Sequence, residues 1–204
     1  MKPTPAKKAA KPPVHRAPPP GEVRIIGGLW KRTRLPVASL PGLRPTPDRV
    51  RETLFNWLGQ DLGGWHCVDA FAGTGALGLE AASRGAATVQ MVEQSGEQVA
   101  RLQQLQTRLE ATGVTVVRGD GVALMRRLAP GSIDLVLLDP PFGAGLEAPA
   151  LQAATPLLRE DGLVYLESDH AWTDDALQAH SLQIHRAGKA GMVHFHLLKK
   201  AAKA

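Results

Sequence analysis

The sequence predicts an α/β protein built on a Rossmann-like, doubly wound and mostly parallel sheet. From residue 67 onward, short apolar segments alternate with segments of helical periodicity, which is the order expected when helices connect parallel strands. The first apolar segment runs into a glycine-rich turn, and a later one ends in Asp-Pro-Pro-Phe. A length of 204 residues fits one such domain with short extensions.

The residues before the core are expected to form an arm, a clasp and a helix. Residues 1–21 contain seven prolines among lysines and alanines, so we expect a disordered basic arm. Residues 22–65 are assigned to the clasp and the helix, and the short extended pieces from Glu22 to Leu43 predict a small basic hairpin or clasp. The helix is expected to start at Thr46-Pro47-Asp48, with the Thr46 side chain as its N-cap.

The core is expected to span residues 66–198, followed by a basic tail at 199–204. Two segments, 182–187 and 191–198, are joined by a short glycine-containing turn, so they are expected to pair as a terminal antiparallel hairpin. The outcome is a seven-stranded sheet with a reversed edge. The other predicted strands are 67–71, 88–93, 114–118, 133–138 and 162–166, and the predicted helices lie near 76–84, 96–111, 121–128 and 148–158.

The positive charge of the chain gathers at its ends. The formal net charge is +5, but residues 1–51 carry twelve basic and two acidic side chains, whereas residues 52–198 carry nine basic and seventeen acidic ones. A basic end on an acidic body is typical of a protein that binds a polyanion such as RNA, because phosphate neutralisation releases counterions. For residues 1–21 a solubilising tail is an equal alternative. The candidate RNA contacts are Arg24, Lys31, Arg32, Arg34, Arg44, Arg49 and Arg51.

Cysteine usage and hydropathy indicate the cellular compartment in which the protein is expected. Cys67 is the only cysteine, which excludes an intramolecular disulfide framework, and its apolar neighbours predict a small core residue. No segment approaches the roughly 20 apolar residues that a membrane span requires. The N-terminus lacks the apolar region of a signal peptide. We therefore expect a cytoplasmic protein.

The glycine turn predicts a ligand that contains a nucleoside. Gly73, Gly75 and Gly78 match the dinucleotide fingerprint, which by itself is a weak signal. The preceding strand contains Asp69 at its end. A carboxylate there would repel a pyrophosphate, yet it suits the ammonium and sulfonium charges of S-adenosyl-L-methionine. The methyl donor is therefore favoured over a nicotinamide dinucleotide.

Two further acidic residues end the next two strands. Glu93 lies eighteen residues beyond Gly75, where it is placed to accept hydrogen bonds from ribose hydroxyls of either ligand. Asp120 ends the third strand, where it could bind an adenine amine, cap the following helix, or do both.

The segment that ends in Asp139-Pro140-Pro141-Phe142 carries the most specific pattern. The exocyclic amine of a base is a poor nucleophile because its lone pair is delocalised into the ring. If the Asp139 carboxylate and the Pro140 carbonyl accept its two N–H groups, the nitrogen is oriented and its developing positive charge is stabilised. Phe142 would stack on a base that has been turned out of its helix or loop. The pattern predicts direct methyl transfer to a base amine, without a covalent enzyme intermediate.

Three other functions stay open on the residues alone. A DNA adenine-N6 methyltransferase uses the same Asp-Pro-Pro-aromatic logic but usually carries an added domain that reads duplex sequence. A nicotinamide-dependent oxidoreductase would need a substrate domain, for which the chain beyond residue 140 has little room. A non-catalytic RNA-binding protein that retains the fold is the third alternative.

The chain resembles the bacterial RsmD-type methyltransferases over nearly all of residues 22–198. The resemblance is carried by Arg24-Ile25-Ile26-Gly27-Gly28, the segment 42–58, the segment 69–78 and Asp139-Pro140-Pro141-Phe142. It implies a class I methyltransferase fold that uses S-adenosyl-L-methionine to modify the N2 amine of one guanine in 16S rRNA. The compactness of the chain further predicts a substrate whose shape is already presented, such as an assembled or partly assembled small subunit. In similar enzymes segment 42–58 covers the donor, which implies a donor-side or RNA-side role for Arg44, Thr46 and Arg49.

Together these arguments give a defined set of candidates. No metal is expected, because the seven histidines show no ligand spacing with a third partner, and a monomer is expected. The candidate catalytic residues are Asp139, Pro140, Pro141 and Phe142. The candidate donor-binding residues are Asp69, Phe71, Gly73, Thr74, Gly75, Glu93, Asp120, Gly121 and Thr46.

Overall fold

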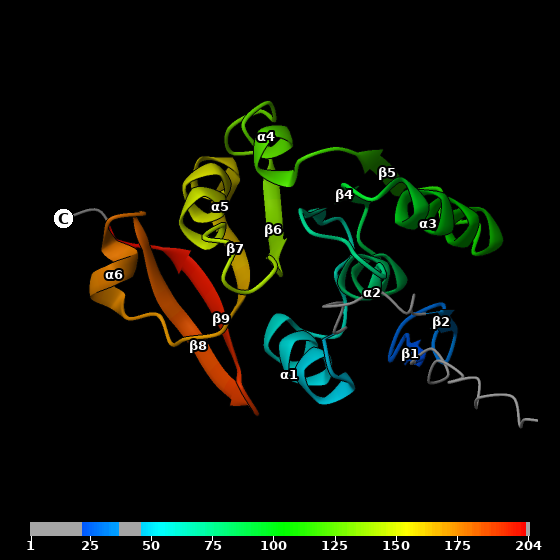
Figure 1. Ribbon diagram of the computed structural model, residues 1–204, viewed down its shortest axis with the longest axis horizontal. Helices are drawn as coiled ribbons and strands as arrows, with labels where there is room; N and C mark the ends of the chain where they lie inside the picture. The colour runs from blue at the N-terminus through cyan, green and yellow to red at the C-terminus, as the bar shows by residue number, and fades with distance from the viewer. Residues whose placement is uncertain (1–21, 37–45, 203–204) are drawn as a thin grey trace, which may run out of the picture.

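The computed structural model describes residues 22–36 and 46–202, which form a three-layer α/β fold (Figure 1). Seven strands make one sheet in the order β5-β4-β3-β6-β7-β9-β8. Its five parallel strands are β3 (His66–Asp69), β4 (Thr88–Glu93), β5 (Val114–Arg118), β6 (Ile133–Leu138) and β7 (Leu158–Ser168). The predicted seven-stranded, mostly parallel and Rossmann-like sheet is confirmed.

Helices cover both faces of this sheet. Side chains of α1 (Asp48–Leu58), α2 (Ala76–Ser83) and α3 (Gly96–Arg108) belong to one apolar cluster. Those of α4 (Gly121–Met125), α5 (Glu147–Ala154) and α6 (Asp174–Gln178) belong to a second cluster. The adjacent residues Cys67 and Val68 of β3 enter different clusters, because successive strand side chains point to opposite faces.

The central strands have apolar sequences because both of their faces are covered. Leu135 and Leu137 of β6 pack into the first cluster, whereas Val136 and Leu138 pack into the second. A strand buried on both sides has no need of alternating polar residues. The strand at 133–138, which has this environment, was predicted at its observed bounds, and so were the strands at 88–93 and 114–118, although β5 lies at the edge of the sheet.

The last two strands form the reversed edge. β8 (Leu182–Ala190) and β9 (Val193–Lys200) pair antiparallel, and β9 is also antiparallel to β7. Gly191 in the turn has a φ of 61°, a conformation that favours glycine. The predicted hairpin is confirmed, although β8 extends three residues beyond its predicted end and β9 begins and ends two residues later than predicted. The short helix α6 and the 3₁₀ turn η1 (Thr155–Leu157) were not predicted.

The first two strands make a separate antiparallel pair, β1 (Glu22–Arg24) with β2 (Arg34–Pro36). We call residues 22–36 the clasp. Leu29 N donates to Ser83 O at 2.7 Å, and Trp30 N donates to Ser83 Oγ at 2.9 Å, which joins the clasp to the end of α2. Gly28 has a φ of 73°, and a Cβ there would lie 1.9 Å from Ser83 O, so only glycine fits this approach. The predicted small hairpin is confirmed.

The start of α1 differs from its prediction. The helix begins at Asp48 with Pro47 in the N-cap position, and no side chain caps it. The prediction that Thr46 is the N-cap was wrong, because the Thr46 hydroxyl bonds to carboxyl groups of the sheet instead. Residues 1–21 and 37–45 lie outside the described residues, so the expected arm is not tested. Within the described ranges, no helix has the length and apolar character needed to cross a membrane.

Candidate active site

Acidic side chains from four neighbouring strands gather at one edge of the sheet. Asp69 ends β3, Glu93 ends β4, Asp139 directly follows β6, and Glu167 lies next to the end of β7. These strands are parallel neighbours, so their carboxyl ends meet at one edge, where open α/β sheets bind ligands. The first three residues were predicted. Glu167 was missed, although it follows an apolar strand in the same manner.

The glycine turn after β3 lies against two of these carboxyl groups. Gly73 N donates to Glu93 Oε2 at 2.9 Å, and Gly78 N donates to Asp69 Oδ2 at 2.9 Å. Gly75 has a φ of 80°, and a Cβ there would lie 2.6 Å from a methyl group of Leu102. The turn therefore needs glycine for its backbone conformation and for its packing.

Asp69 has the properties of a site for a positively charged group. Its side chain is buried, and burial raises its pKa to about 7, against the opposing effect of the Gly78 hydrogen bond. Asp69 Oδ1 is buried without a hydrogen-bond partner among the described residues. A buried acceptor without a donor is costly, so this oxygen fits the ammonium group of S-adenosyl-L-methionine. The residues present thus suit this donor.

Glu93 and Asp120 are both fixed by backbone contacts. Glu93 Oε1 accepts Ser95 N at 2.7 Å, which leaves each of its oxygens with capacity for one ribose hydroxyl. Asp120 Oδ1 accepts Ala123 N at 2.7 Å, so Asp120 is the N-cap of α4, one of the two roles weighed for it. A Cβ on Gly121 would lie 2.0 Å from Ala70 O, which shows how closely α4 approaches β3.

The other predicted donor-binding residues lie in or beside the same turn. Thr74 is buried within the glycine turn, and Phe71 is half-buried against the second apolar cluster. Their contacts with a donor stay predictions.

The Asp-Pro-Pro-Phe segment places the carboxyl group of Asp139 three residues before the exposed ring of Phe142. Asp139 is half-buried, Pro140 is buried and Pro141 is exposed. Phe142 is 45% exposed, whereas most large apolar side chains of the described residues are buried. Burial raises the pKa of Asp139 well above its usual range, and the negative charges of Glu167 and Asp69 raise it further. An exposed ring beside this acceptor is free to stack on a base.

A hydrogen-bonded group that the sequence did not predict surrounds Asp139. Thr46 Oγ1 lies 2.7 Å from Glu167 Oε1 and 3.4 Å from Asp139 Oδ2. Tyr165 Oη donates to Glu167 Oε1 at 2.9 Å. The segment before α1 therefore covers the ends of β6 and β7. Thr46 was predicted on the donor side, and the structure places its hydroxyl on the two carboxyl groups.

Comparison with known proteins identifies the family. The model of the family described as "Conserved hypothetical protein 95" matches residues 23–199. The chain belongs to this family, the RsmD family. It is 40% identical over 186 residues to "Ribosomal RNA small subunit methyltransferase D" of Escherichia coli (strain K12), covering 90% of this chain and 92% of that protein. It is 31% identical over 178 residues to the protein of the same name from Buchnera aphidicola subsp. Baizongia pistaciae, covering 86% and 90%.

Solved structures of relatives share the fold of this RsmD-family chain. The Escherichia coli protein yhhF has a TM-score of 0.77 at 38% identity, covering 90% of this chain and all of that one. A methylase structure from Haemophilus influenzae has a TM-score of 0.73 at 30% identity, covering 89% of this chain and all of that one. The predicted Rossmann-like methyltransferase fold is confirmed.

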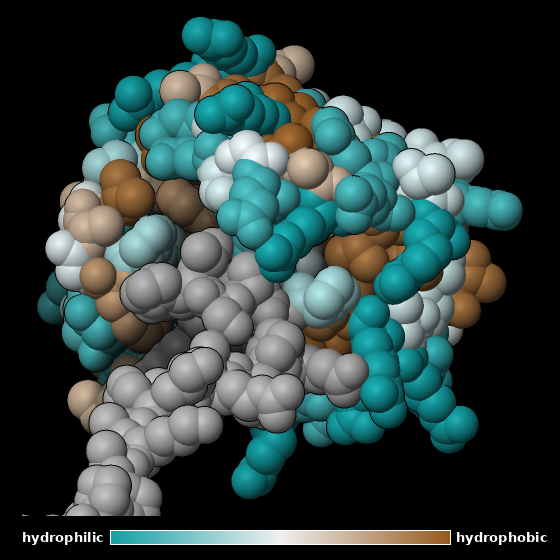
Figure 2. Space-filling view, turned by 45° about the vertical axis from the view of Figure 1, so that its right-hand side comes forward, coloured by the Kyte–Doolittle hydropathy of each residue, from teal (hydrophilic) through white to brown (hydrophobic). Residues whose placement is uncertain are grey.

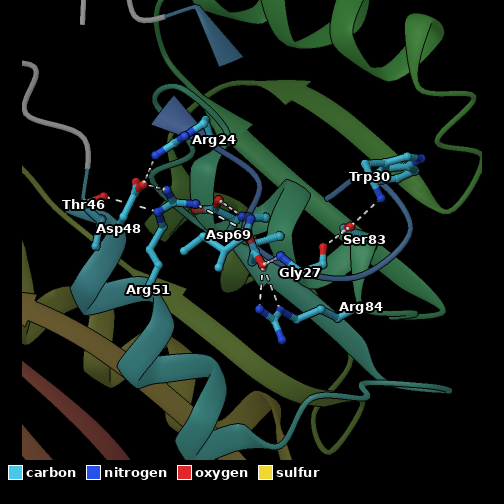
Figure 3. A network of polar contacts seen from close by, with 12 residues as sticks. Arg24, Gly27, Trp30, Thr46, Asp48, Arg51, Asp69, Ser83 and Arg84 are labelled. Atoms are coloured by element: carbon cyan, nitrogen blue, oxygen red, sulfur yellow. Dashed lines mark hydrogen bonds and ion pairs between the residues drawn. The ribbon is translucent and has the colours of Figure 1, made fainter. Parts of the chain in front are cut away.

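A buried ion network fixes the clasp to α2 in this RsmD-family chain (Figure 3). Glu80 of α2 is buried, and its two carboxylate oxygens accept Ile26 N at 2.7 Å and Gly27 N at 2.8 Å. The same carboxylate forms ion pairs with Arg84 Nη2 at 2.8 Å and Arg51 Nη1 at 3.4 Å. Sequence reasoning missed Glu80, although it is the one acidic residue in an otherwise alanine- and leucine-rich helix.

Arg51 does not lie on the surface. Its side chain is 0% exposed and is held by Glu80 and by Asp48 Oδ1 at 2.6 Å. Its Nε also donates to Thr46 O at 3.3 Å. The prediction that Arg51 contacts RNA was wrong, because a buried and paired guanidinium is not available to a phosphate.

The other predicted RNA contacts within the described residues are exposed. Hydrophilic side chains cover much of the face that Figure 2 turns forward, which in Figure 1 is the side of β1, β2 and α3. The contact of these predicted residues with RNA stays a prediction. Arg44 lies outside the described residues. The exposed residues are Arg24, Lys31, Arg32, Arg34 and Arg49.

Two other polar features are assigned no role in the proposed site. The ligand atoms of Glu147, Asp169 and His170 lie within 4.8 Å of one another, and His170 Nδ1 already contacts Asp169 Oδ1 at 2.8 Å. The expected absence of a metal stays a prediction. Burial raises the pKa of Cys67 to about 12, so it is a neutral core thiol, as predicted.

Proposed function

We propose that this protein transfers a methyl group from S-adenosyl-L-methionine to the exocyclic N2 amine of a guanine in 16S rRNA, in an assembled or partly assembled small ribosomal subunit. One observation carries the proposal: Asp139 and Pro140 follow β6, next to Asp69 at the end of the neighbouring strand β3. An acceptor for an amine therefore lies beside a group suited to the charge of the methyl donor.

The residues of the site orient the reactants. S-adenosyl-L-methionine supplies a methyl group on a positively charged sulfur, which needs no further activation. The Asp139 carboxylate and the Pro140 carbonyl accept the two N–H groups, so that the lone pair of the nitrogen is directed toward the methyl group. Phe142 stacks on the extruded base. Asp69 holds the ammonium group of the donor, and Glu93 accepts its ribose hydroxyls.

RNA is preferred over DNA on the strength of the relatives and the clasp. The relatives from Escherichia coli and Haemophilus influenzae are both named "Ribosomal RNA small subunit methyltransferase D". The exposed basic residues of the clasp suit a phosphate backbone. The choice of guanine over adenine rests on the resemblance to the family, because both bases present an amine. We further propose that the protein acts in the cytoplasm as a monomer without a metal.

The test is incubation with labelled donor, followed by mapping of the methylated nucleotide. Three substrates are compared: small subunits that lack the modification, naked 16S rRNA, and duplex DNA. Label on the N2 amine of one guanine in 16S rRNA is the expected result. Label on adenine in DNA would instead support the adenine-N6 enzyme, and RNA binding without any label would support a non-catalytic protein.

A calorimetric titration separates the enzyme classes. S-adenosyl-L-methionine is expected to bind, and NAD is not, because the Asp69 carboxylate would repel a pyrophosphate. Binding of NAD alone would overturn the proposal.

A further inference from the structure

The carboxyl groups of Asp139 and Glu167 share one hydroxyl group. Thr46 Oγ1 contacts Glu167 Oε1 at 2.7 Å and Asp139 Oδ2 at 3.4 Å. A threonine hydroxyl has a single proton to donate, so it cannot satisfy two ionised carboxylates. The second contact is favourable only when that carboxyl group is protonated and donates to Thr46 Oγ1. The arrangement therefore fits one proton distributed over two carboxyl groups.

The contacts of Glu167 indicate which group holds this proton. Glu167 Oε1 accepts hydrogen bonds from both Thr46 and Tyr165, as expected of an ionised oxygen. Glu167 is only 2% exposed, and this burial raises its pKa, but its hydrogen bonds with Thr46 and Tyr165 and the positive charge of Arg51 on α1 oppose that effect and favour its ionised form. Asp139 faces the negative charges of Glu167 on β7 and Asp69 on β3. The proton therefore belongs on Asp139, which can donate it to Thr46.

We infer that Glu167 and Thr46 are positioning residues that make Asp139 the acceptor of the proton released by the methylated amine. The inference rests on the proposed function, because it assigns a task to the same site. Glu167 repels a negative charge on Asp139, and Thr46 accepts a hydrogen bond from its protonated form. Both contacts favour proton uptake, so Asp139 is a stronger base than an isolated aspartate.

The proton balance of the step is simple. Asp139 is ionised while it accepts the N–H groups of the amine, and the nitrogen carries an extra positive charge once it has accepted the methyl group. One N–H bond then breaks, its electron pair stays on nitrogen, and an O–H bond forms on Asp139. The resulting pair, with Asp139 protonated and Glu167 ionised, is the arrangement that the contacts of Thr46 favour. Asp139 is half-buried, so its proton passes to water when the base leaves.

The pH dependence of single-turnover methyl transfer tests this inference. Transfer needs ionised Asp139, so the rate rises with pH through the pKa of this group. Glu167→Gln removes a neighbouring negative charge, which lowers that pKa and moves the acidic limb of the profile by about one pH unit toward lower pH. Glu160→Gln, an exposed change on the same strand, is the matched control and should leave the limb unchanged. An unchanged limb in Glu167→Gln would overturn the inference.

The hydroxyl group is tested by two substitutions of Thr46. Thr46→Val keeps the shape but removes the acceptor for protonated Asp139, so its acidic limb should also move to lower pH. Thr46→Ser restores the hydroxyl and should restore the profile. Equal profiles for Val and Ser would remove Thr46 from the proposal, and circular dichroism checks that each variant is folded.

Infrared spectroscopy of the donor-free protein gives a readout that does not depend on activity. Carboxylic-acid C=O absorption is expected near neutral pH, where Asp69 also contributes to it. The part of this absorption that is lost in Asp139→Asn should titrate at lower pH in Glu167→Gln. Absence of a band that depends on Asp139 would overturn the shared proton. If the unaltered protein methylates no nucleic acid, the proposed function fails, and the infrared titration still decides whether the two carboxyl groups hold a proton.

Discussion

Replacement of Glu80 by glutamine tests the buried ion network between the clasp and the core. Glutamine keeps the volume of the side chain but removes its charge. Arg51 and Arg84, whose side chains are almost completely buried, would then lose their shared counterion. Arg51 would keep Asp48 as a partner, whereas Arg84 would keep the amide oxygen of Gln60 and the ring of Phe55 but no carboxylate.

The expected loss follows from the burial of these groups. Removing one partner of a buried ion pair costs about 3–5 kcal/mol, because a charge stays behind without compensation. The amide nitrogen of glutamine would also face one of the two backbone N–H groups that Glu80 accepts, and an unsatisfied N–H costs about 1–3 kcal/mol. These costs overlap because the side chain can reorient. We therefore expect a decrease of about 3–5 kcal/mol in the free energy of unfolding, from a typical total of about 5–15 kcal/mol.

The chain provides a matched control for this experiment. Glu97 pairs with Arg101 at 2.6 Å with the same helical spacing as Glu80 and Arg84, but these two side chains are 60% and 38% exposed. Glu97→Gln should cost no more than about 0.5 kcal/mol. Urea denaturation gives both values, and hydrogen exchange at Ile26 and Gly27 should speed up only in Glu80→Gln. A loss for Glu80→Gln as small as that of the control would refute the reasoning.

Three further predictions concern the site and its surface. Asp139→Ala should lower the rate of methyl transfer at least about 100-fold while donor affinity is retained, because the missing acceptor acts on the transition state. Single-turnover assays measure this rate, and equal rates for Asp139→Ala and the exposed variant Asp161→Ala would contradict the prediction. Affinity for S-adenosyl-L-methionine should fall about tenfold per pH unit below 7, because Asp69, with its pKa raised to about 7, binds a cation only when ionised; calorimetry should show a flatter profile for Asp69→Asn. Lys31→Gln with Arg32→Gln should weaken RNA binding and reduce the slope of log affinity against log salt concentration by about 0.7 for each phosphate that the protein no longer neutralises. Filter binding measures this slope, and an equal effect of the exposed change Arg126→Gln would contradict a surface specific to the clasp.

The parts of the fold that depend on local pattern could be predicted from the sequence. The segments at 88–93, 114–118 and 133–138 form strands at these bounds, and the last of them carries the apolar run expected of a strand that is buried on both faces. Asp69, Glu93 and Asp139 could be placed at one edge because parallel strands bring their carboxyl ends together. Predicting them needed only the order of the strands along the chain.

The contacts that depend on packing could not be predicted in the same way. Arginine is usually a surface residue, and only the approach of α1 to α2 shows that Arg51 is buried and paired with Glu80. Thr46 before a proline and an aspartate is a standard capping pattern, yet two carboxyl groups of the sheet compete for its hydroxyl. The sequence did offer signals for Glu80 and Glu167, because each interrupts or follows an apolar segment. Their partners lie at distant positions in the chain, and local pattern does not identify them.

The clasp and the carboxyl groups of the candidate active site belong to one continuous set of polar contacts. Glu80 holds the backbone of the clasp and also pairs with Arg51, whose Nε donates to Thr46 O at 3.3 Å. The hydroxyl of that same threonine reaches Asp139 and Glu167. Because Arg51 is buried, it cannot exchange these partners for water, so the position of Thr46 depends on the charge on α2. This gives a physical reason for the family match to begin at residue 23, inside the clasp, and not at the first strand of the sheet. The clasp therefore supports the candidate active site, in addition to the RNA contact proposed for its exposed basic residues.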